Sequence, residues 1–243
     1  MKEERFQFSE NGEWSAVVHH ITSELTPRGL DLIHPFQVEW YNKRVPASFF
    51  LPDFGRPQSL GILVANTKSL WPQFINAFSR NTFLQDDPNP LDRYVQEQVH
   101  NVLGKLPVRW DVRWDCSSPG ERVAMQRLAE IAGCATLSST HLSIHPKFGP
   151  WISLRAVIVL DVPGDGLKAP EKTNNLCSDC ERSCLPHFER AMNSVRELTS
   201  ESVSRDWKQW LAVRDACPVG RGEHRFYDNQ ILYSYTKDRV FLK

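Results

Sequence analysis

The sequence predicts an α+β protein in which helices flank a β-sheet. Two short apolar segments, residues 60–66 (LGILVAN) and residues 151–160 (WISLRAVIVL), are rich in β-branched side chains and indicate buried strands. Helical patterns lie between the predicted strands at irregular intervals, which favours an α+β sheet protein over a doubly wound one. No G-x-G-x-x-G follows a strand and no G-x-x-x-x-G-K-[ST] is present, so neither a dinucleotide site nor a phosphate loop is predicted.

The remaining elements follow from periodicity and turn residues. Apolar positions at helical spacing predict helices over residues 14–25, 69–80, 90–106, 121–132, 186–198 and 202–213, and a last helix around 227–235. Extended segments are predicted over residues 34–42, 60–66, 108–115 and 151–160. Residues 134–144 are expected to pair with the strand over 151–160. The segment 165–185 contains glycine, proline, lysine and three cysteines, and we expect it to be an irregular loop.

Length and composition bound the class of protein. At 243 residues the chain can bury a full core, and we expect a polar, frayed tail over residues 1–13 and a single domain over 14–243. Lysine plus arginine equal aspartate plus glutamate at 29 each, so no basic field for nucleic acid is predicted. No apolar run approaches the roughly 20 residues that span a membrane, and residues 1–14 lack the apolar core of a signal peptide. We therefore expect a cytoplasmic protein without nucleic acid or membrane partners, whose six cysteines are thiols, metal ligands or redox groups.

One charged residue interrupts the strongest predicted strand. Arg155 lies between Leu154 and Ala156, and a guanidinium in a buried strand is costly unless a fixed anion meets it. The residues before this strand, 145–151 (HPKFGPW), form a predicted turn with an imidazole, a lysine and two aromatic rings. A rigid strand beside such a loop is a common way to present a ligand site.

Three segments together resemble the CblC/MMACHC family of cytosolic cobalamin-processing proteins. The central motif, residues 144–164 (IHPKFGPWISLRAVIVLDVPG), resembles the family's IHPxFGxWxxxRxVxxLxxPG. The N-terminal motif, residues 34–42 (HPFQVEWYN), resembles its PFQVxWYN, and the C-terminal motif, residues 210–235, resembles its RDAVTPxERYxxxQxxYF. The motifs keep the family's order and approximate spacing, from about residue 25 to the C-terminus. The resemblance implies a flavin-nitroreductase-like antiparallel sheet flanked by helices.

The resemblance also implies an enzyme that removes the upper axial ligand of cobalamin. For an alkylcobalamin, a glutathione thiolate would attack the cobalt-bound carbon, which makes the protein an alkylcobalamin dealkylase of the glutathione S-alkyltransferase type. For cyanocobalamin, reduction by glutathione or by a reduced flavin (FMN or FAD) would expel cyanide. A downstream cobalamin-trafficking protein is a further implied partner. Two alternatives stay open: an iron–sulfur or flavin oxidoreductase with a substrate other than cobalamin, and a non-catalytic cobalamin chaperone.

Three arginines match positions that the family links to glutathione: Arg155, Arg214 and, more loosely, Arg239. Arginine suits this substrate because glutathione carries two carboxylates that can accept bidentate hydrogen bonds. From the residues alone, Arg214 could equally pair with Asp215 or another acid. No protein nucleophile is expected, because the thiol substrate supplies it, so no catalytic residue is assigned.

The expected cobalamin contacts follow from the same resemblance. They are Asp115, Val123, Ala124, Met125, Gln126, Leu137, Ser138, Ser139, Ser143 and Leu154. The amide of Gln126 and the carboxylate of Asp115 suit the amide side chains at the rim of the corrin, although both could be surface residues at the ends of elements. Residues 137–139 replace aromatic residues and a glutamine of the family, Ser143 replaces a cysteine and Glu130 a histidine, so these contacts differ from the family's. The family binds cobalamin base-off without a protein histidine on cobalt, which implies a structural role for His145.

The cobalamin and glutathione chemistry implied by the resemblance assigns no role to four of the cysteines. Cys177, Cys180 and Cys184 form a C-x-x-C-x-x-x-C pattern, and Cys217 precedes Pro218. Four thiolates could bind Zn²⁺ or an iron–sulfur cluster, and the C-x-x-C pair could instead be a redox dithiol or bare thiols. The chain also resembles cobalamin-dependent epoxyqueuosine reductases, which combine a related fold with iron–sulfur clusters, so the cluster remains an alternative.

Overall fold

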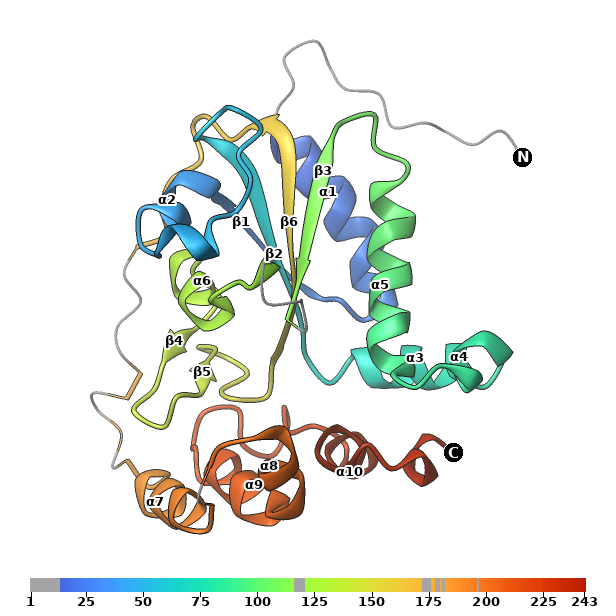
Figure 1. Ribbon diagram of the computed structural model, residues 1–243, viewed down its shortest axis with the longest axis vertical. Coiled ribbons are helices and arrows are strands. Elements are labelled where there is room, and N and C mark those ends of the chain that lie inside the picture. Colours follow the sequence, from blue (N-terminus) through green and yellow to red (C-terminus); the bar gives the residue numbers. More distant parts are fainter. Residues whose placement is uncertain (1–13, 116–120, 172–175, 178–179, 181, 196) are drawn as a thin grey trace. The chain divides into compact units, whose positions relative to one another are not determined.

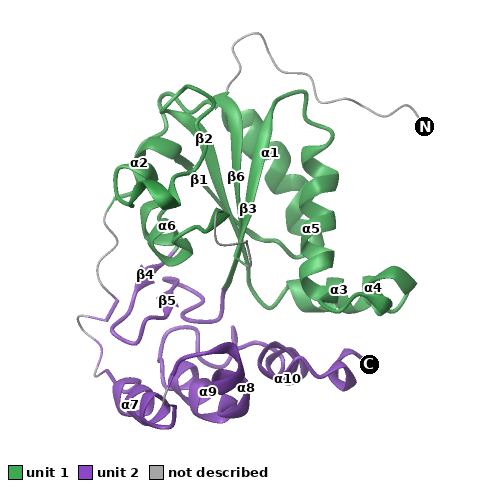
Figure 2. Ribbon diagram, viewed as in Figure 1, with its two compact units in different colours: residues 1–134, 153–171 green, residues 135–152, 172–243 purple. Residues whose placement is uncertain are grey.

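A computed structural model describes residues 14–115, 121–171, 176–177, 180, 182–195 and 197–243 (Figure 1). The tail expected over residues 1–13 lies outside the described residues. The chain divides into two compact units (Figure 2): unit 1 comprises residues 1–134 and 153–171, and unit 2 comprises residues 135–152 and 172–243. The single domain expected over 14–243 stays a prediction.

Unit 1 is built on a four-stranded antiparallel sheet. Its strands are β1 (Leu32–Gln37), β2 (Ser59–Asn66), β3 (Trp110–Trp114) and β6 (Ser153–Pro163), in the order β1-β2-β6-β3. Every residue of β2 is buried, as expected for an inner strand without polar alternation. Every residue of β3 is half-buried, which agrees with the alternating sequence and with its position at the edge of the sheet. The strands predicted over 60–66, 108–115 and 151–160 are confirmed.

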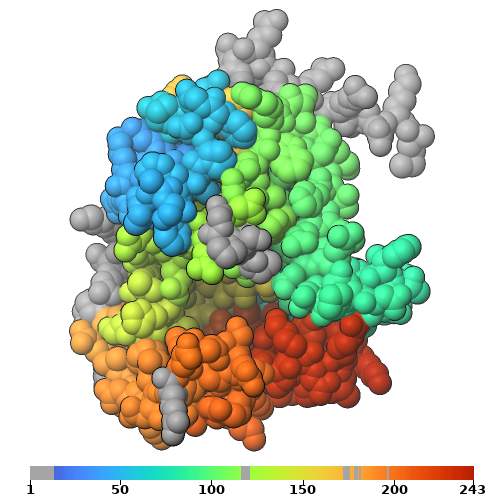
Figure 3. All heavy atoms as spheres, viewed as in Figure 1, coloured from blue at the N-terminus to red at the C-terminus, as the bar shows by residue number. Residues whose placement is uncertain are grey.

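Helices cover both faces of this sheet. They are α1 (Trp14–Leu25), α2 (Val38–Asn42), α3 (Leu70–Phe78), α4 (Thr82–Asp86), α5 (Pro90–Leu103) and α6 (Met125–Ile131), with 3₁₀ turns η1 (Thr26–Arg28) and η2 (Ala47–Phe49). In Figure 2, α1 and α5 lie on one side of the sheet and α2 and α6 on the other. In Figure 3, α3 and α4 protrude from unit 1, and Phe83 of α4 is 83% exposed. The α+β class with helices flanking an antiparallel sheet is therefore confirmed.

Two predictions in unit 1 need correction at their boundaries. Residues 34–42 are not extended throughout, because β1 ends at Gln37 and α2 begins at Val38. Pro35 disfavours helix only at the residue before it, and Val38 and Tyr41, three positions apart, are both buried on one side of a helical turn. The helix expected from residue 121 begins at Met125. Helix α4 was not predicted, and the side chain of Asn81 caps it by accepting the amides of Phe83 and Leu84.

Unit 2 contains a small hairpin and a group of helices. The hairpin strands are β4 (Thr136–Leu137) and β5 (Ser143–Ile144), and the helices are α7 (Leu185–Asn193), α8 (Ser200–Arg205), α9 (Trp207–Asp215) and α10 (Asp228–Thr236), followed by the 3₁₀ turn η4 (Arg239–Leu242). The expected pairing of residues 134–144 with the 151–160 strand is wrong. Both sides of β6 are already occupied by β2 and β3, so β4 and β5 pair with each other instead.

A second correction concerns the helix predicted over residues 202–213. It is two helices, because the chain leaves helical geometry at Asp206. Thr199 begins α8 with a capping box in which Thr199 and Ser202 exchange side-chain and backbone hydrogen bonds. Trp151, Phe226 and Ile231 form a buried apolar cluster of this unit, against which Leu211 and Tyr235 pack.

Candidate functional site

Arg214, in the last turn of α9, is held by backbone carbonyls and aromatic rings. Its Nη2 donates to the carbonyl oxygens of Pro150 (2.6 Å) and Ile152 (3.3 Å). The guanidinium carbon lies 5.2 Å from the ring centroid of Trp151 and 5.4 Å from that of Phe226. These contacts join the C-terminal motif to the residues of the central motif that belong to unit 2.

The carboxylate partner considered for Arg214 is not Asp215. Asp215 is engaged by Arg225, whose Nε donates to Asp215 Oδ1 at 2.7 Å and whose Nη1 donates to Asp228. Within the described part of the chain, no ion pair involves Arg214, and its buried Nε has no hydrogen-bond partner there. Arg214 as a whole is half-buried, but a buried N–H donor without an acceptor is costly unless one is supplied. Arg214 therefore has the capacity to bind an anion.

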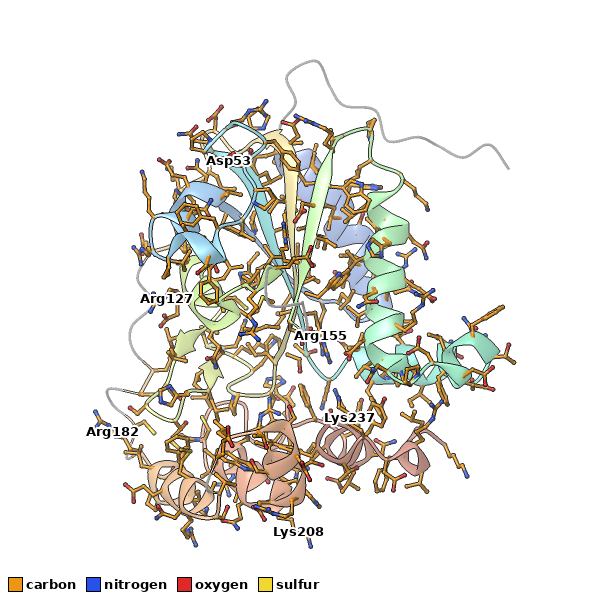
Figure 4. All side chains as sticks on the ribbon, viewed as in Figure 1. Asp53, Arg127, Arg155, Arg182, Lys208 and Lys237 are labelled. Atoms are coloured by element: carbon orange, nitrogen blue, oxygen red, sulfur yellow. The ribbon has the colours of Figure 1, made fainter. Side chains whose placement is uncertain are left out.

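A cavity of about 590 Å³ in unit 2 contains Arg214 in its wall; we call it the arginine cavity. A second cation, Lys237, lines it from the end of α10, where Figure 4 labels it. Hydroxyl groups from α8 and α10 complete the polar part of the wall: Thr199, Ser200, Ser204, Ser234 and Tyr235. The described lining contains no carboxylate. Its volume lies in the range of small-molecule sites, roughly 300–1,000 Å³.

Of the other two predicted glutathione residues, neither lines this cavity. Arg239 is exposed at the start of η4. Arg155 belongs to β6 in unit 1, where its side chain is 11% exposed. The sequence analysis did not assign Lys237 to the site, because the C-terminal motif ends at residue 235. The signal that could have indicated it was a cation two residues after the end of that motif.

Arg155 has partners within unit 1. Its Nε donates to the side-chain oxygen of Asn66 at 2.7 Å, and its Nη1 lies 3.7 Å from a carboxylate oxygen of Asp92. The second separation exceeds hydrogen-bond length, so Asp92 neutralises the charge without closing a hydrogen bond. Asp115 lies beside it, since its backbone N–H donates to the carbonyl of Arg155 at 3.1 Å. Figure 4 shows Arg155 on the sheet of unit 1.

The other expected cobalamin contacts of unit 1 lie around the start of α6. Val123 and Ala124 precede the helix, Met125 and Gln126 begin it, and Gln126 is exposed. The amide of Ala124 donates to the hydroxyl of buried Tyr41 at 2.8 Å, so the N-terminal motif fixes this helix start. Burial raises the pKa of Tyr41, which keeps its hydroxyl protonated. Leu154 of β6 is half-buried.

The remaining cobalamin candidates lie on the β4–β5 hairpin of unit 2. Leu137 and Ser139 are exposed. Ser138 is buried and has a structural role, because its Oγ accepts the amides of Thr140 (3.3 Å) and Leu142 (3.0 Å) inside the turn. Ser143 has a buried Oγ that finds no hydrogen-bond partner among the described residues. Among these candidates, the hairpin thus exposes the apolar side chain of Leu137 and the hydroxyl of Ser139.

Two histidines of the motifs are part of the scaffold. His145 Nδ1 accepts the backbone amides of Lys147 (3.0 Å) and Phe148 (3.2 Å), which closes the turn before Gly149. Burial lowers the pKa of His34, and a hydrogen bond to the backbone of Ala132 partly opposes that shift. These hydrogen bonds agree with the structural role expected for His145.

Cys177, Cys180, Cys184 and Cys217 line one small cavity of unit 2, which we call the cysteine cavity. None of the four forms a disulfide. Burial raises the pKa of Cys177 and of Cys217, and the neighbouring thiols raise both further. Among the residues that the structure describes, no three His, Cys, Asp or Glu side chains are already arranged to hold a metal ion. Cys134 lies outside this cavity, and burial raises the pKa of its thiol to about 12.

The sheet and its flanking helices define a nitroreductase-like fold. The C. elegans B12-trafficking protein CblC superimposes with a TM-score of 0.69 at 16% identity, covering 94% of both chains. An epoxyqueuosine reductase superimposes with a TM-score of 0.54 at 11% identity, covering 93% of this chain and 70% of that one. At these identities the likeness concerns the fold alone.

The sequence comparison is more specific. The model of the methylmalonic aciduria and homocystinuria type C family matches residues 29–239, so the chain belongs to this family. It is 29% identical over 234 residues to the cyanocobalamin reductase / alkylcobalamin dealkylase of Mus musculus, covering 89% of this chain and 77% of that protein. The Homo sapiens protein of the same name is 26% identical, with coverage of 89% and 76%. Within the described residues, no helix has the length and apolar character needed to cross a membrane.

Proposed function

We propose that the protein is a cytoplasmic enzyme that binds cobalamin and removes its upper axial ligand. The family match over residues 29–239 and the names of the mouse and human relatives support cyanocobalamin decyanation and alkylcobalamin dealkylation. The exposed groups at the start of α6 and on the β4–β5 hairpin are the proposed contacts to the corrin amides, each within its own unit. A downstream trafficking protein would receive the processed cofactor.

We further propose that the thiol substrate is glutathione, bound in the arginine cavity. The observation that carries this proposal is the wall of that cavity, which has two cations, several hydroxyls and no described carboxylate. Glutathione carries two carboxylates and a single ammonium group, so it complements such a wall. Arg214 would use its unpartnered Nε for one carboxylate, while the Pro150 and Ile152 carbonyls hold the guanidinium in place. Arg155 and Arg239 do not line the arginine cavity, and each is a separate proposed contact to glutathione.

In dealkylation, the glutathione thiolate attacks the carbon bound to cobalt. A carbon–sulfur bond forms, the electron pair of the cobalt–carbon bond stays on cobalt, and the products are a thioether and cob(I)alamin. The protein supplies proximity rather than a nucleophile of its own. Binding the substrate base-off, without a histidine below cobalt, favours this low-coordinate product over the substrate. In decyanation, glutathione or reduced FMN or FAD would donate the electron that loosens cyanide from cobalt.

The experiment compares two lysine variants of unit 2. Lys237 lines the arginine cavity, whereas Lys208 of α9 is a cation that does not, so Lys208→Ala is the matched control. We expect Lys237→Ala to raise the KM for glutathione roughly five- to tenfold, the worth of about 1–1.4 kcal/mol, with unchanged cobalamin binding. An unaltered KM in Lys237→Ala, or an equal rise in Lys208→Ala, would place the thiol elsewhere. Cobalamin binding without any turnover would favour the chaperone alternative.

A further inference from the structure

The proposed reaction uses none of the four cysteines of the cysteine cavity, although this cavity shares Leu142 with the arginine cavity and is lined by Ser138 of the hairpin. Three chain segments meet around it. They are the residues before α7, which carry Cys177, Cys180 and Cys184, the residues after α9, which include Cys217, and the β4–β5 hairpin. The first two segments are joined directly, because the hydroxyl of Ser183 donates to the carbonyl of Ala216 at 2.8 Å. These two residues are the chain neighbours of Cys184 and Cys217, so the hydrogen bond holds the two cysteines at one site.

Backbone amides are directed at two of the four sulfur atoms. The amide of Arg182 donates to Sγ of Cys180 at 3.3 Å, and the amide of Val219 donates to the sulfur of Cys217. In both cases the donor is two residues after the cysteine. Amide donors of this kind stabilise a thiolate and orient it, as outer-shell groups do for metal ligands. Two segments that are distant in the sequence therefore each place a backbone donor beside a cysteine of this cavity.

The cavity has room for a single small ligand. Its volume is about 20 Å³. That volume exceeds the roughly 10–15 Å³ needed for one water molecule. The remaining wall consists of apolar and hydroxyl side chains such as Leu142, Ile144, Val213 and Thr140, and contributes no described carboxylate or imidazole ligand.

We propose that Cys177, Cys180, Cys184 and Cys217 bind one Zn²⁺ ion as a tetrathiolate centre. Four soft sulfur ligands in tetrahedral geometry select zinc among common mononuclear ions, and a C-x-x-C pair is a usual half of such a site. Because the thiols are not yet in ligand geometry, they close on the ion to about 2.3 Å, and each thiol that binds releases its proton to solvent. The ion thereby fastens the segment before α7 to the end of α9.

The centre has a structural role in this account. Cys217 follows Arg214 by three residues, so the ion fixes the end of the helix that presents Arg214 to the arginine cavity. The β4–β5 hairpin, which carries Leu137 and Ser143, forms another part of the wall. Zinc loss should therefore loosen unit 2 without removing a reacting group.

The first experiment measures zinc in the full-length wild-type protein, purified without chelator or oxygen. We expect about one zinc per chain and no acid-labile sulfide. Removing the ion and titrating with Co²⁺ alone should produce sulfur-to-cobalt charge-transfer bands and the intense d–d bands of a tetrahedral tetrathiolate site. Absence of both the zinc and these bands overturns the proposal. Stoichiometric iron with sulfide also overturns it, in favour of a cluster.

A second experiment identifies the ligands. Cys180→Ser should lose stoichiometric zinc, whereas Cys134→Ala, a buried cysteine outside the cavity, should retain it. If Cys180→Ser does not fold, thiol counting on the native wild-type protein serves instead. Four thiols should resist alkylation with zinc bound and become reactive after chelation. Retained zinc in Cys180→Ser, or no change in reactivity after chelation, contradicts the assignment.

Discussion

At the scale of single residues, the two best-matched arginines have different surroundings. Arg155 is fixed within unit 1 by Asn66 and by the nearby charge of Asp92, while Arg214 is fixed by carbonyls and rings and keeps a donor unused. A buried strand with a lone cation allowed two interpretations, internal pairing and ligand binding. The structure gives Arg155 internal contacts, and a measurement that separates stability from substrate affinity tests its proposed ligand role.

That measurement compares Arg155→Ala with Asp92→Asn. We predict that Arg155→Ala raises the KM for glutathione while the protein still folds, with a loss of about 1–3 kcal/mol in unfolding free energy because Asn66 loses its donor. Asp92→Asn removes the same internal charge contact but no candidate ligand group, so its KM should stay unchanged. Urea unfolding and initial rates at sub-saturating glutathione report the two quantities. Equal KM values in both variants and the wild type would assign Arg155 to the scaffold.

His34 gives a pH prediction at the same scale. Burial lowers its pKa in the folded state below the ordinary value of 6.5. The unfolded chain therefore takes up this proton first as the pH falls, and the free energy of unfolding should decrease from about pH 6.5 down to the folded pKa. Above pH 7 both states are neutral at this site and the effect vanishes. His34→Gln should flatten this acid-side slope in chemical unfolding, and the same change at exposed His19 should not; an identical slope in His34→Gln contradicts the account.

At the scale of elements, the turn that ends at Gly149 explains why the central and C-terminal motifs occur together. Gly149 has φ +57°, and a Cβ there would lie 1.9 Å from the carbonyl oxygen of Val219. Gly220 has φ +70°, and a Cβ there would lie 2.3 Å from the carbonyl oxygen of Phe148. The two backbone segments are in contact where no side chain fits. This contact lies directly before Pro150 and Ile152, whose carbonyls accept hydrogen bonds from Arg214.

We predict a large difference between two glycine substitutions. Gly149→Ala combines a positive φ with an overlap against backbone, and should destabilise unit 2 by several kcal/mol or prevent folding. Gly166→Ala is the control, because it shares a positive φ of +80° but has nothing within 4 Å of its Cβ. It should cost only about 1 kcal/mol. Thermal unfolding of both purified variants measures the difference in stability. Similar melting temperatures would show that the close contact between Gly149 and the Val219 carbonyl does not exclude a Cβ.

At the scale of the whole molecule, the sequence predicted those helices and strands whose formation depends on local apolar patterns. Strand β2 and helix α1 were placed to within a residue, because their apolar periodicity is uninterrupted. The partner of residues 134–144 could not be predicted, because strand pairing depends on which edges other strands have already taken. The arginine cavity could not be predicted from the sequence either. It brings Ser200 and Lys237 beside Arg214, and no periodicity encodes such a meeting of distant segments.

The proposed reaction is the transfer of the upper ligand of an alkylcobalamin to glutathione. The most direct test incubates the purified wild-type protein with methylcobalamin and glutathione under anaerobic conditions. Mass spectrometry follows the thioether, and absorbance follows the corrin. We predict that S-methylglutathione forms in an amount equal to the cob(I)alamin, and that none forms in the absence of protein. Bound methylcobalamin that stays intact at saturating glutathione, with no thioether detected, would contradict it.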